Sequence, residues 1–162
     1  DSIKFRSYMD SGYKEKFGYC YRIIGGDILD KKELIKRALE AQTLAYVPYS
    51  NFHVGAAVLT EDDTIYSGCN IEISSYSPTI CAERTAIFKA ISEGHTNIKA
   101  IAIVGDSNPT FPCGVCRQVI REFGKDAKII IANSADNYKM YTLDELLPHS
   151  FGPEDLDNKL GE

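Results

Sequence analysis

Three cysteines and one glutamate form the pattern in this chain that could do chemistry. Cys81 and Glu83 stand two residues apart, and after an interval of 28 residues the stretch Pro112-Cys113-Gly-Val-Cys116 follows. Three thiolates fill three corners of a tetrahedral zinc site and leave the fourth corner for water, which distinguishes a catalytic zinc site from a closed structural one. The spacing therefore predicts a Zn²⁺ site on Cys81, Cys113 and Cys116 that activates water.

Glu83 is expected to move protons and not to bind the metal. Residues two apart on a helix do not share a face, so Glu83 meets the zinc-bound water from the side while Cys81 holds the ion. A first His or Cys ligand, a nearby Glu that is not a ligand, and a later Pro-Cys-x-x-Cys form the signature of zinc deaminases. The four residues predict a hydrolytic deamination.

Two other uses of the cysteines remain as alternatives. A structural four-cysteine zinc site would take Cys20 or Cys69 as its fourth ligand, but closed sites usually contain two paired Cys-x-x-Cys knuckles, and neither residue has such a partner. A thioredoxin-like redox pair would account for the Cys-x-x-Cys stretch alone. It would leave Cys81 and Glu83 without a role.

Composition narrows the class of protein. The 162 residues, 44% of them hydrophobic, are enough for one compact core, and no segment has the roughly 18 consecutive apolar residues of a membrane span. The net charge of −5 argues against a nucleic-acid binder, which would gather Lys and Arg on one face. Five cysteines, three of them assigned to a metal, do not fit a secreted disulfide framework. We expect a cytoplasmic protein that acts on a small molecule, with no membrane or nucleic-acid partner.

The chain divides into an aromatic-rich accessory extension over residues 1–29 and a domain over residues 30–162. The extension lacks the continuous apolar stretch of a signal peptide and is expected to pack on the domain. Alternating helix and strand patterns follow it, which predicts an α/β fold: a three-layer α/β/α sandwich with a mixed β-sheet. The expected elements are a helix from a capping box at 30–33 to Pro48, strands at 53–60 and 64–70, a helix from about Cys81 to Gly94, a strand at 100–104, a helix at 113–123, strands at 129–132 and 138–141, and a short helix capped at Thr142.

Both cysteine groups stand at the starts of predicted helices. Unpaired backbone N–H groups and the positive end of the helix dipole favour the thiolate there. Three thiolates and Zn²⁺ leave a net charge of about −1, which makes bound water less acidic than in a three-histidine site. Arg84 and Arg117 each follow a key residue directly, so they are expected to offset that charge by donating hydrogen bonds to the cysteine sulfurs.

An ordered series of motifs resembles the cytidine deaminase family, in its small homotetrameric branch, from about Lys32 to Leu156. Agreement at this many ordered stretches does not arise by chance. The stretches are VPYSNFHVGAA at 47–57, GCNIE at 68–72, CAERTA at 81–86, PCGVCRQ at 112–118, LLP at 146–148 and FGP at 151–153.

The resemblance implies a role for most of the motif residues. It implies that the three cysteines bind zinc and that Glu83 transfers protons. The backbone beside Ala82 would help to orient the pyrimidine base in the pocket. An amide and a carboxylate two residues apart on an extended segment also suit a sugar hydroxyl, which both donates and accepts. The resemblance assigns the ribose to Asn70 and Glu72, the nucleoside face to Phe52, and completion of a neighbouring subunit's pocket to Tyr76 and Phe151.

The implied reaction is hydrolysis of cytidine and 2′-deoxycytidine to uridine and 2′-deoxyuridine with release of ammonia, in a homotetramer with shared active sites. A polynucleotide deaminase would need a basic path for phosphates, which the acidic balance disfavours. A deaminase of another aminopyrimidine nucleoside would alter the ribose contacts, and Asn70 and Glu72 argue against it. A non-enzymatic zinc module would have no use for Glu83.

The loop at Ser74–Thr79 departs from the smaller, Gly-containing loop of many relatives.

Overall fold

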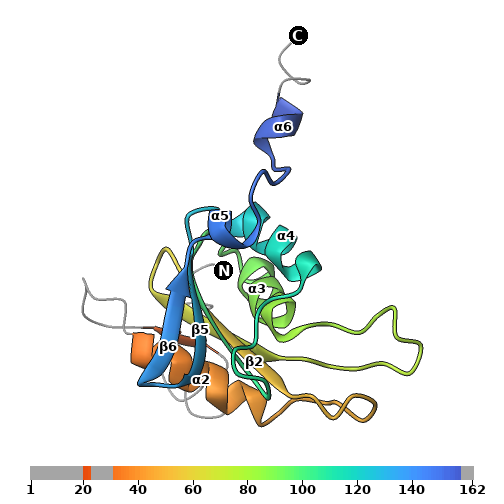
Figure 1. Cartoon of the computed structure of the whole chain (residues 1–162). Coiled ribbons are helices and arrows are strands. Elements are labelled where there is room, and N and C mark those ends of the chain that lie inside the picture. The colour runs from red at the N-terminus through yellow and green to blue at the C-terminus, as the bar shows by residue number, and fades with distance from the viewer. Residues whose placement is uncertain (1–19, 23–30, 158–162) are drawn as a thin grey trace, which may run out of the picture.

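A six-stranded mixed β-sheet with helices on both faces organises the part of the chain that the computed structural model describes, residues 20–22 and 31–157 (Figure 1). The strand order is β1-β3-β2-β4-β5-β6; β4 and β5 run parallel, and the other neighbours are antiparallel. The predicted mixed sheet is confirmed. The strands are β1 (Cys20–Arg22), β2 (Val54–Thr60), β3 (Thr64–Cys69), β4 (Ile98–Gly105), β5 (Lys128–Ser134) and β6 (Asn137–Tyr141).

Helices cover the sheet from both sides and give it two cores. α2 (Lys31–Gln42) packs on one face, while α3 (Ala82–Ser92), α4 (Gly114–Phe123) and the short α5 (Leu143–Leu146) pack on the other (Figure 1). The period of two along β2 divides its side chains between the cores: Ala57 and Leu59 face α2, and Ala56 and Val58 face α3. The three-layer prediction is confirmed in this arrangement. None of the described helices has the length and apolar character that crossing a membrane requires.

Two glycines let helices lie close to the sheet. A Cβ on Gly55 of β2 would overlap the carbonyl oxygen of Ala38 in α2. A Cβ on Gly68 of β3 would come within 2.6 Å of the Ala86 backbone nitrogen in α3. Only glycine permits such an approach of backbone to backbone. Gly68 thereby seats α3, whose first residue follows Cys81, directly against the sheet.

The structure describes only part of the predicted extension, and it corrects one predicted helix end and confirms one predicted helix cap. β1 falls within residues 1–29 and pairs with β3; the rest of the extension, and the Asp30 cap, lie outside the described residues. The helix expected to run to Pro48 ends earlier, at Gln42. The reason is a competing pairing: Tyr46 N–H donates to the Asn70 carbonyl at 3.0 Å, so this segment joins the chain after β3. The capping box at Thr142 is confirmed, because Thr142 and Glu145 satisfy each other's backbone N–H groups.

Candidate zinc centre and substrate pocket

The three predicted zinc ligands converge at the starts of two adjacent helices. Cys81 is the N-cap of α3, Cys113 is the N-cap of α4, and Cys116 lies in the first turn of α4. Neither N-cap thiol bonds the helix backbone. The three Sγ atoms all lie within 4.8 Å of one another, and those of Cys81 and Cys113 are 3.8 Å apart. Sulfurs about 2.3 Å from a tetrahedral zinc lie about 3.8 Å from each other, so the arrangement fits Zn²⁺.

The protonation of the thiols also fits a metal site. A hydrogen bond from Cys116, with further donors from Arg84, lowers the pKa of Cys81 to about 5 although burial opposes ionisation. The same bond to Cys81, together with burial, raises the pKa of Cys116. One thiolate is thus present before a metal binds. Cys69 does not belong to this cluster, because its thiol donates to the Leu44 carbonyl at 3.4 Å.

Glu83 lies in the first turn of α3 and is almost completely buried, with 4% of its surface exposed. Burial raises its pKa to about 7, and the negative charge of Cys81 adds to the effect. A carboxyl group with a pKa near neutrality can both accept and release a proton at working pH. The cluster of possible ligand atoms contains the three sulfurs and no oxygen of Glu83. The position of Glu83 therefore suits a group that carries protons to and from water bound at the cysteine cluster.

The two arginines behave differently. Arg84 Nη2 donates to Cys81 Sγ at 3.6 Å and to the Thr79 carbonyl at 3.3 Å, as expected for a group that offsets the charge of the sulfurs. Arg117 does not make the predicted bond to sulfur: Nε donates to the Pro112 carbonyl at 2.8 Å and Nη1 to the Leu146 carbonyl at 2.7 Å. The acceptor at the end of α5 lies far away in sequence, which the local pattern could not reveal. Arg117 therefore ties the loop before Cys113 to α5.

Asn70 and Glu72 both hold the loop at 49–54. Asn70 Oδ1 accepts from Val54 N–H at 2.8 Å, and Asn70 Nδ2 donates to the Phe52 carbonyl at 2.8 Å. Glu72 Oε2 accepts from the backbone N–H groups of residues 49 and 50, at 2.9 and 3.1 Å. Hydrogen bonds from Ser50 and from the Tyr49 backbone lower the pKa of Glu72, so it stays ionised. Sequence reasoning had not foreseen this second use of the pair.

Glu72 and Tyr76 line one cavity of about 340 Å³, together with Tyr49, Ser50 and Thr79. This volume lies within the range of small-molecule sites. The rings of Tyr49 and Tyr76 meet edge to face with centroids 5.9 Å apart. The Thr79 carbonyl that accepts from Arg84 links the cavity wall to the cysteine cluster. Tyr49, Ser50 and Thr79 were missed, although the first two belong to the same motif as Phe52.

Three aromatic residues predicted to contact substrate are exposed. The exposed fractions are 36% for Phe52, 70% for Tyr76 and 59% for Phe151. The cavity is lined by Tyr76 but not by Phe52 or Phe151. Ala82, by contrast, is fully buried as the first residue of α3. Among the described residues, Tyr49 and Tyr76 are thus the aromatic side chains that line the cavity.

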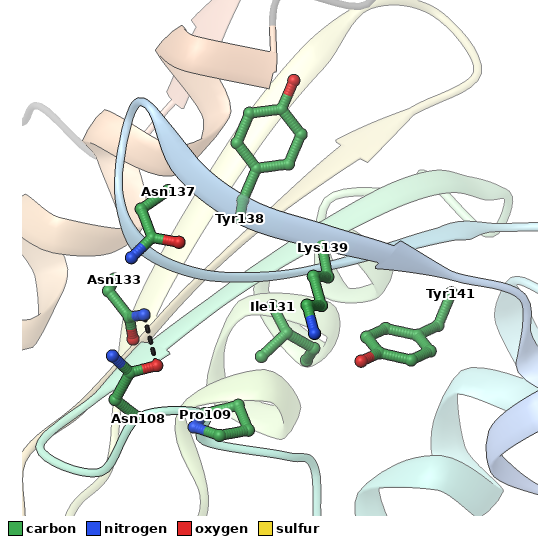
Figure 2. A pocket seen from close by; sticks show the side chains of 8 residues that line it. All are labelled: Asn108, Pro109, Ile131, Asn133, Asn137, Tyr138, Lys139 and Tyr141. Carbon is green, nitrogen blue, oxygen red and sulfur yellow. Dashed lines mark hydrogen bonds between the residues drawn. The ribbon is translucent and has the colours of Figure 1, made fainter.

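A second cavity, of about 100 Å³, lies between β6 and the loop after β4 (Figure 2). Asn133 Nδ2 donates to Asn108 Oδ1 across one side of it, and Lys139 and Tyr141 line the other (Figure 2). Its lining contains no cysteine and no carboxylate. This cavity therefore contains none of the cysteine cluster and no group that could carry protons as Glu83 can.

Comparison with known proteins agrees with this geometry. Residues 29–133 match the family model described as the cytidine and deoxycytidylate deaminase zinc-binding region. The chain is 51% identical over 130 residues to a cytidine deaminase of Sporosarcina psychrophila, covering 79% of this chain and 96% of that protein. It is 48% identical over 132 residues to one of Halalkalibacterium halodurans, covering 80% and 100%.

A solved structure shows the same fold. The crystal structure of cytidine deaminase from Burkholderia pseudomallei superposes with a TM-score of 0.70 at 43% identity, over 74% of this chain and 97% of that one. The three-cysteine cluster, the buried glutamate beside it and these similarities agree with one another. This chain belongs to the cytidine and deoxycytidylate deaminase family.

Proposed function

We propose that this protein hydrolyses cytidine and 2′-deoxycytidine to uridine and 2′-deoxyuridine and releases ammonia. One observation carries the proposal: three Sγ atoms lie within 4.8 Å of one another, and the Glu83 carboxyl group, 4% exposed, lies in the first turn of α3, the helix that Cys81 caps. The strong similarity to cytidine deaminases supports the choice of substrate. Water is the second reactant, so the balance is cytidine plus water to uridine plus ammonia.

Cys81, Cys113 and Cys116 would hold Zn²⁺, which supplies a Lewis acid that brings the pKa of a water molecule towards about 7. Glu83 takes a proton from the water as its oxygen adds to C4 of the pyrimidine. The same carboxyl group passes that proton to ring N3. It then takes the second proton from the new C4 hydroxyl and passes it to the amine, so that the C4–N bond breaks, a C4 carbonyl forms and ammonia leaves. Burial of Glu83 keeps these protons away from bulk water, and a pKa of about 7 allows both directions of transfer.

The substrate contacts follow from the loop that Asn70 and Glu72 hold. The ionised Glu72 faces the cavity and is suited to accept from a ribose hydroxyl, with Asn70 beside it. Phe52 packs beside the nucleoside, and the backbone at Ala82 orients the base. None of these contacts requires the 2′-hydroxyl, so the 2′-deoxynucleoside is also a substrate.

The active form is a homotetramer in which neighbouring chains complete each pocket. Tyr76 and Phe151 are 70% and 59% exposed in one chain, and an assembly with closed symmetry gives each ring a partner surface. Other large apolar side chains are exposed as well, Leu44 to 61% and Val115 to 59%. Burial of such groups is the main source of association energy.

The protein acts in the cytoplasm, in pyrimidine salvage. Support comes from the four cysteines with described side chains, which are all free thiols, as a reducing compartment and a thiolate metal site require. Residues 30–162 form the catalytic domain and residues 1–29 an accessory extension. Pairing of β1 with β3 supports an extension that adds to the edge of the sheet.

A parallel substrate assay tests the function. Uridine and ammonia are measured with zinc-loaded protein and cytidine, 2′-deoxycytidine, their 5′-monophosphates and a cytosine-containing oligonucleotide. We expect the highest kcat/KM for the two nucleosides, because the net charge is −5 and the ionised Glu72 on the cavity wall disfavours a phosphate in the cavity. Protein stripped of zinc by a chelator serves as the control. A higher kcat/KM for a monophosphate or for the oligonucleotide would contradict the assigned substrate class.

A further inference from the structure

We propose that Arg121 is a positioning residue that holds the C-terminal segment 150–155, so that Phe151 covers the substrate pocket of a second copy of the chain. The inference rests on the proposed function and on its shared active sites. It adds the residue that fixes the shared ring in place, a role that neither the zinc chemistry nor the predicted contacts require.

Arg121 lies on α4 and is buried, with 5% of its surface exposed. Its Nε donates to Ser150 Oγ at 2.9 Å, and its Nη2 donates to a carboxylate oxygen of Glu154. Lys125 Nζ reaches the same oxygen at 2.8 Å. Hydrogen bonds from Lys125 and Arg121 lower the pKa of Glu154 to about 2, so the carboxylate stays ionised. The guanidinium thus joins the residues on both sides of Phe151.

The backbone between these two contacts is also held. Gln118, one turn before Arg121 on α4, donates from Nε2 to the Phe151 carbonyl at 3.0 Å. Gly152 N–H donates to Asp155 Oδ2 at 2.7 Å. Gly152 lies against the guanidinium so closely that a Cβ there would overlap Arg121. The segment therefore has one fixed path over α4.

The ring that this segment carries faces solvent. Phe151 is 59% exposed, and Leu156 of α6 (Glu154–Asp157) is 55% exposed. α6 projects away from α4 and α5 and from the body of the sheet (Figure 1). A segment that served as an anchor within its own chain would bury its aromatic ring and leave its polar groups in water. Here the polar groups are fixed and no described residue buries the ring, which fits a ring whose partner is a second copy of the chain.

A second copy of the chain supplies a partner of matching chemistry. The cavity beside Glu72 has two exposed tyrosines on its wall, Tyr49 at 51% and Tyr76 at 70%, and no other aromatic side chain among the described residues lines it. In a closed symmetric assembly, a tail that leaves one chain reaches the same surface on every neighbour. The exposed Phe151 ring of one chain can therefore pack against the tyrosines of the cavity on a second copy.

Steady-state kinetics of the substitutions Arg121→Leu, Phe151→Ala and the double substitution test the proposal. Loss of an aromatic stack on a base corresponds to about a 5- to 150-fold loss of affinity. We expect each single variant to raise KM for cytidine within this range with little change in kcat and with full zinc content. The double variant should match Phe151→Ala alone, because the two residues act as a unit. Arg37→Leu on α2, which removes ion pairs on the opposite face of the sheet, should leave KM unchanged.

A second arm covers the case in which Arg121→Leu does not fold. Glu154→Ala removes an exposed partner of Arg121 and should raise KM several-fold in the same direction. Co-expression of Arg121→Leu chains with Glu83→Gln chains should restore a component with wild-type KM, because the Glu83→Gln chains supply intact tails to the intact sites.

Different results would overturn the role of Arg121 and the proposed deaminase function. An active wild type in which Phe151→Ala raises KM while Arg121→Leu and Glu154→Ala do not would overturn the role of Arg121. Multiplied effects in the double variant, or no low-KM component in the mixed assembly, would also overturn it. A wild-type protein that forms no uridine would overturn the proposed function and, with it, the role given to Arg121.

Discussion

Asn70→Ala tests whether Asn70 positions the pocket loop. The substitution removes the acceptor of Val54 N–H and the donor to the Phe52 carbonyl, both at 2.8 Å. A hydrogen bond contributes about 0.5 to 1.5 kcal/mol net, so the loss of two lowers the free energy of unfolding by about 1 to 3 kcal/mol. Because Phe52 and the Glu72-bound turn move with the loop, KM for cytidine should rise while zinc content stays full.

The assay pairs urea unfolding with steady-state kinetics at one fixed protein concentration, since the apparent stability of an assembly depends on concentration. Asn133→Ala is the matched control. Asn133 donates to Asn108 beside the second cavity, so its loss removes one exposed bond, costs less than about 1 kcal/mol and leaves KM unchanged. If Asn70→Ala resembles Asn133→Ala in both stability and KM, the loop does not depend on Asn70 and the reasoning fails.

Two further predictions concern the metal site. Cys113→Ala should lose zinc together with activity, whereas Cys69→Ala, outside the cluster, should keep both. Elemental analysis measures the zinc content of each variant. One tightly held zinc per chain in Cys113→Ala would show that Cys113 is not a ligand. Arg84→Ala should lower kcat about 10- to 100-fold in protein with full zinc content, because Arg84 donates to Cys81 Sγ. An unchanged kcat would show that the hydrogen bond from Arg84 does not contribute to catalysis.

Local patterns were sufficient to pick out the three cysteines that the structure brings together, and to predict most of the fold. Cys81, Cys113 and Cys116 are set by where two helices begin, and helix starts leave a signature within a few residues. The apolar run at 53–60 likewise predicted a strand, and the structure has β2 at Val54–Thr60, with side chains in both cores. The sheet then brings the two helix starts together, since both helices pack on the same face.

Contacts between distant segments set the features that sequence reasoning missed. The first helix stops at Gln42 because Tyr46 pairs with the chain after β3. Arg117 turns from sulfur to the Leu146 carbonyl because α5 presents an acceptor 29 residues away. The bonds from Asn70 to the loop at 52–54 also span two strands. None of these partners can be read from the neighbouring residues.

The most direct test of the account is the rate of uridine formation from cytidine by Glu83→Gln protein that carries the same zinc content as wild type. Gln keeps the size of the buried side chain and removes its ability to carry a proton. We expect a rate lower by about 10²- to 10⁴-fold, the contribution of general acid–base catalysis. A zinc-loaded Glu83→Gln protein that turns cytidine over at nearly the wild-type rate would contradict it.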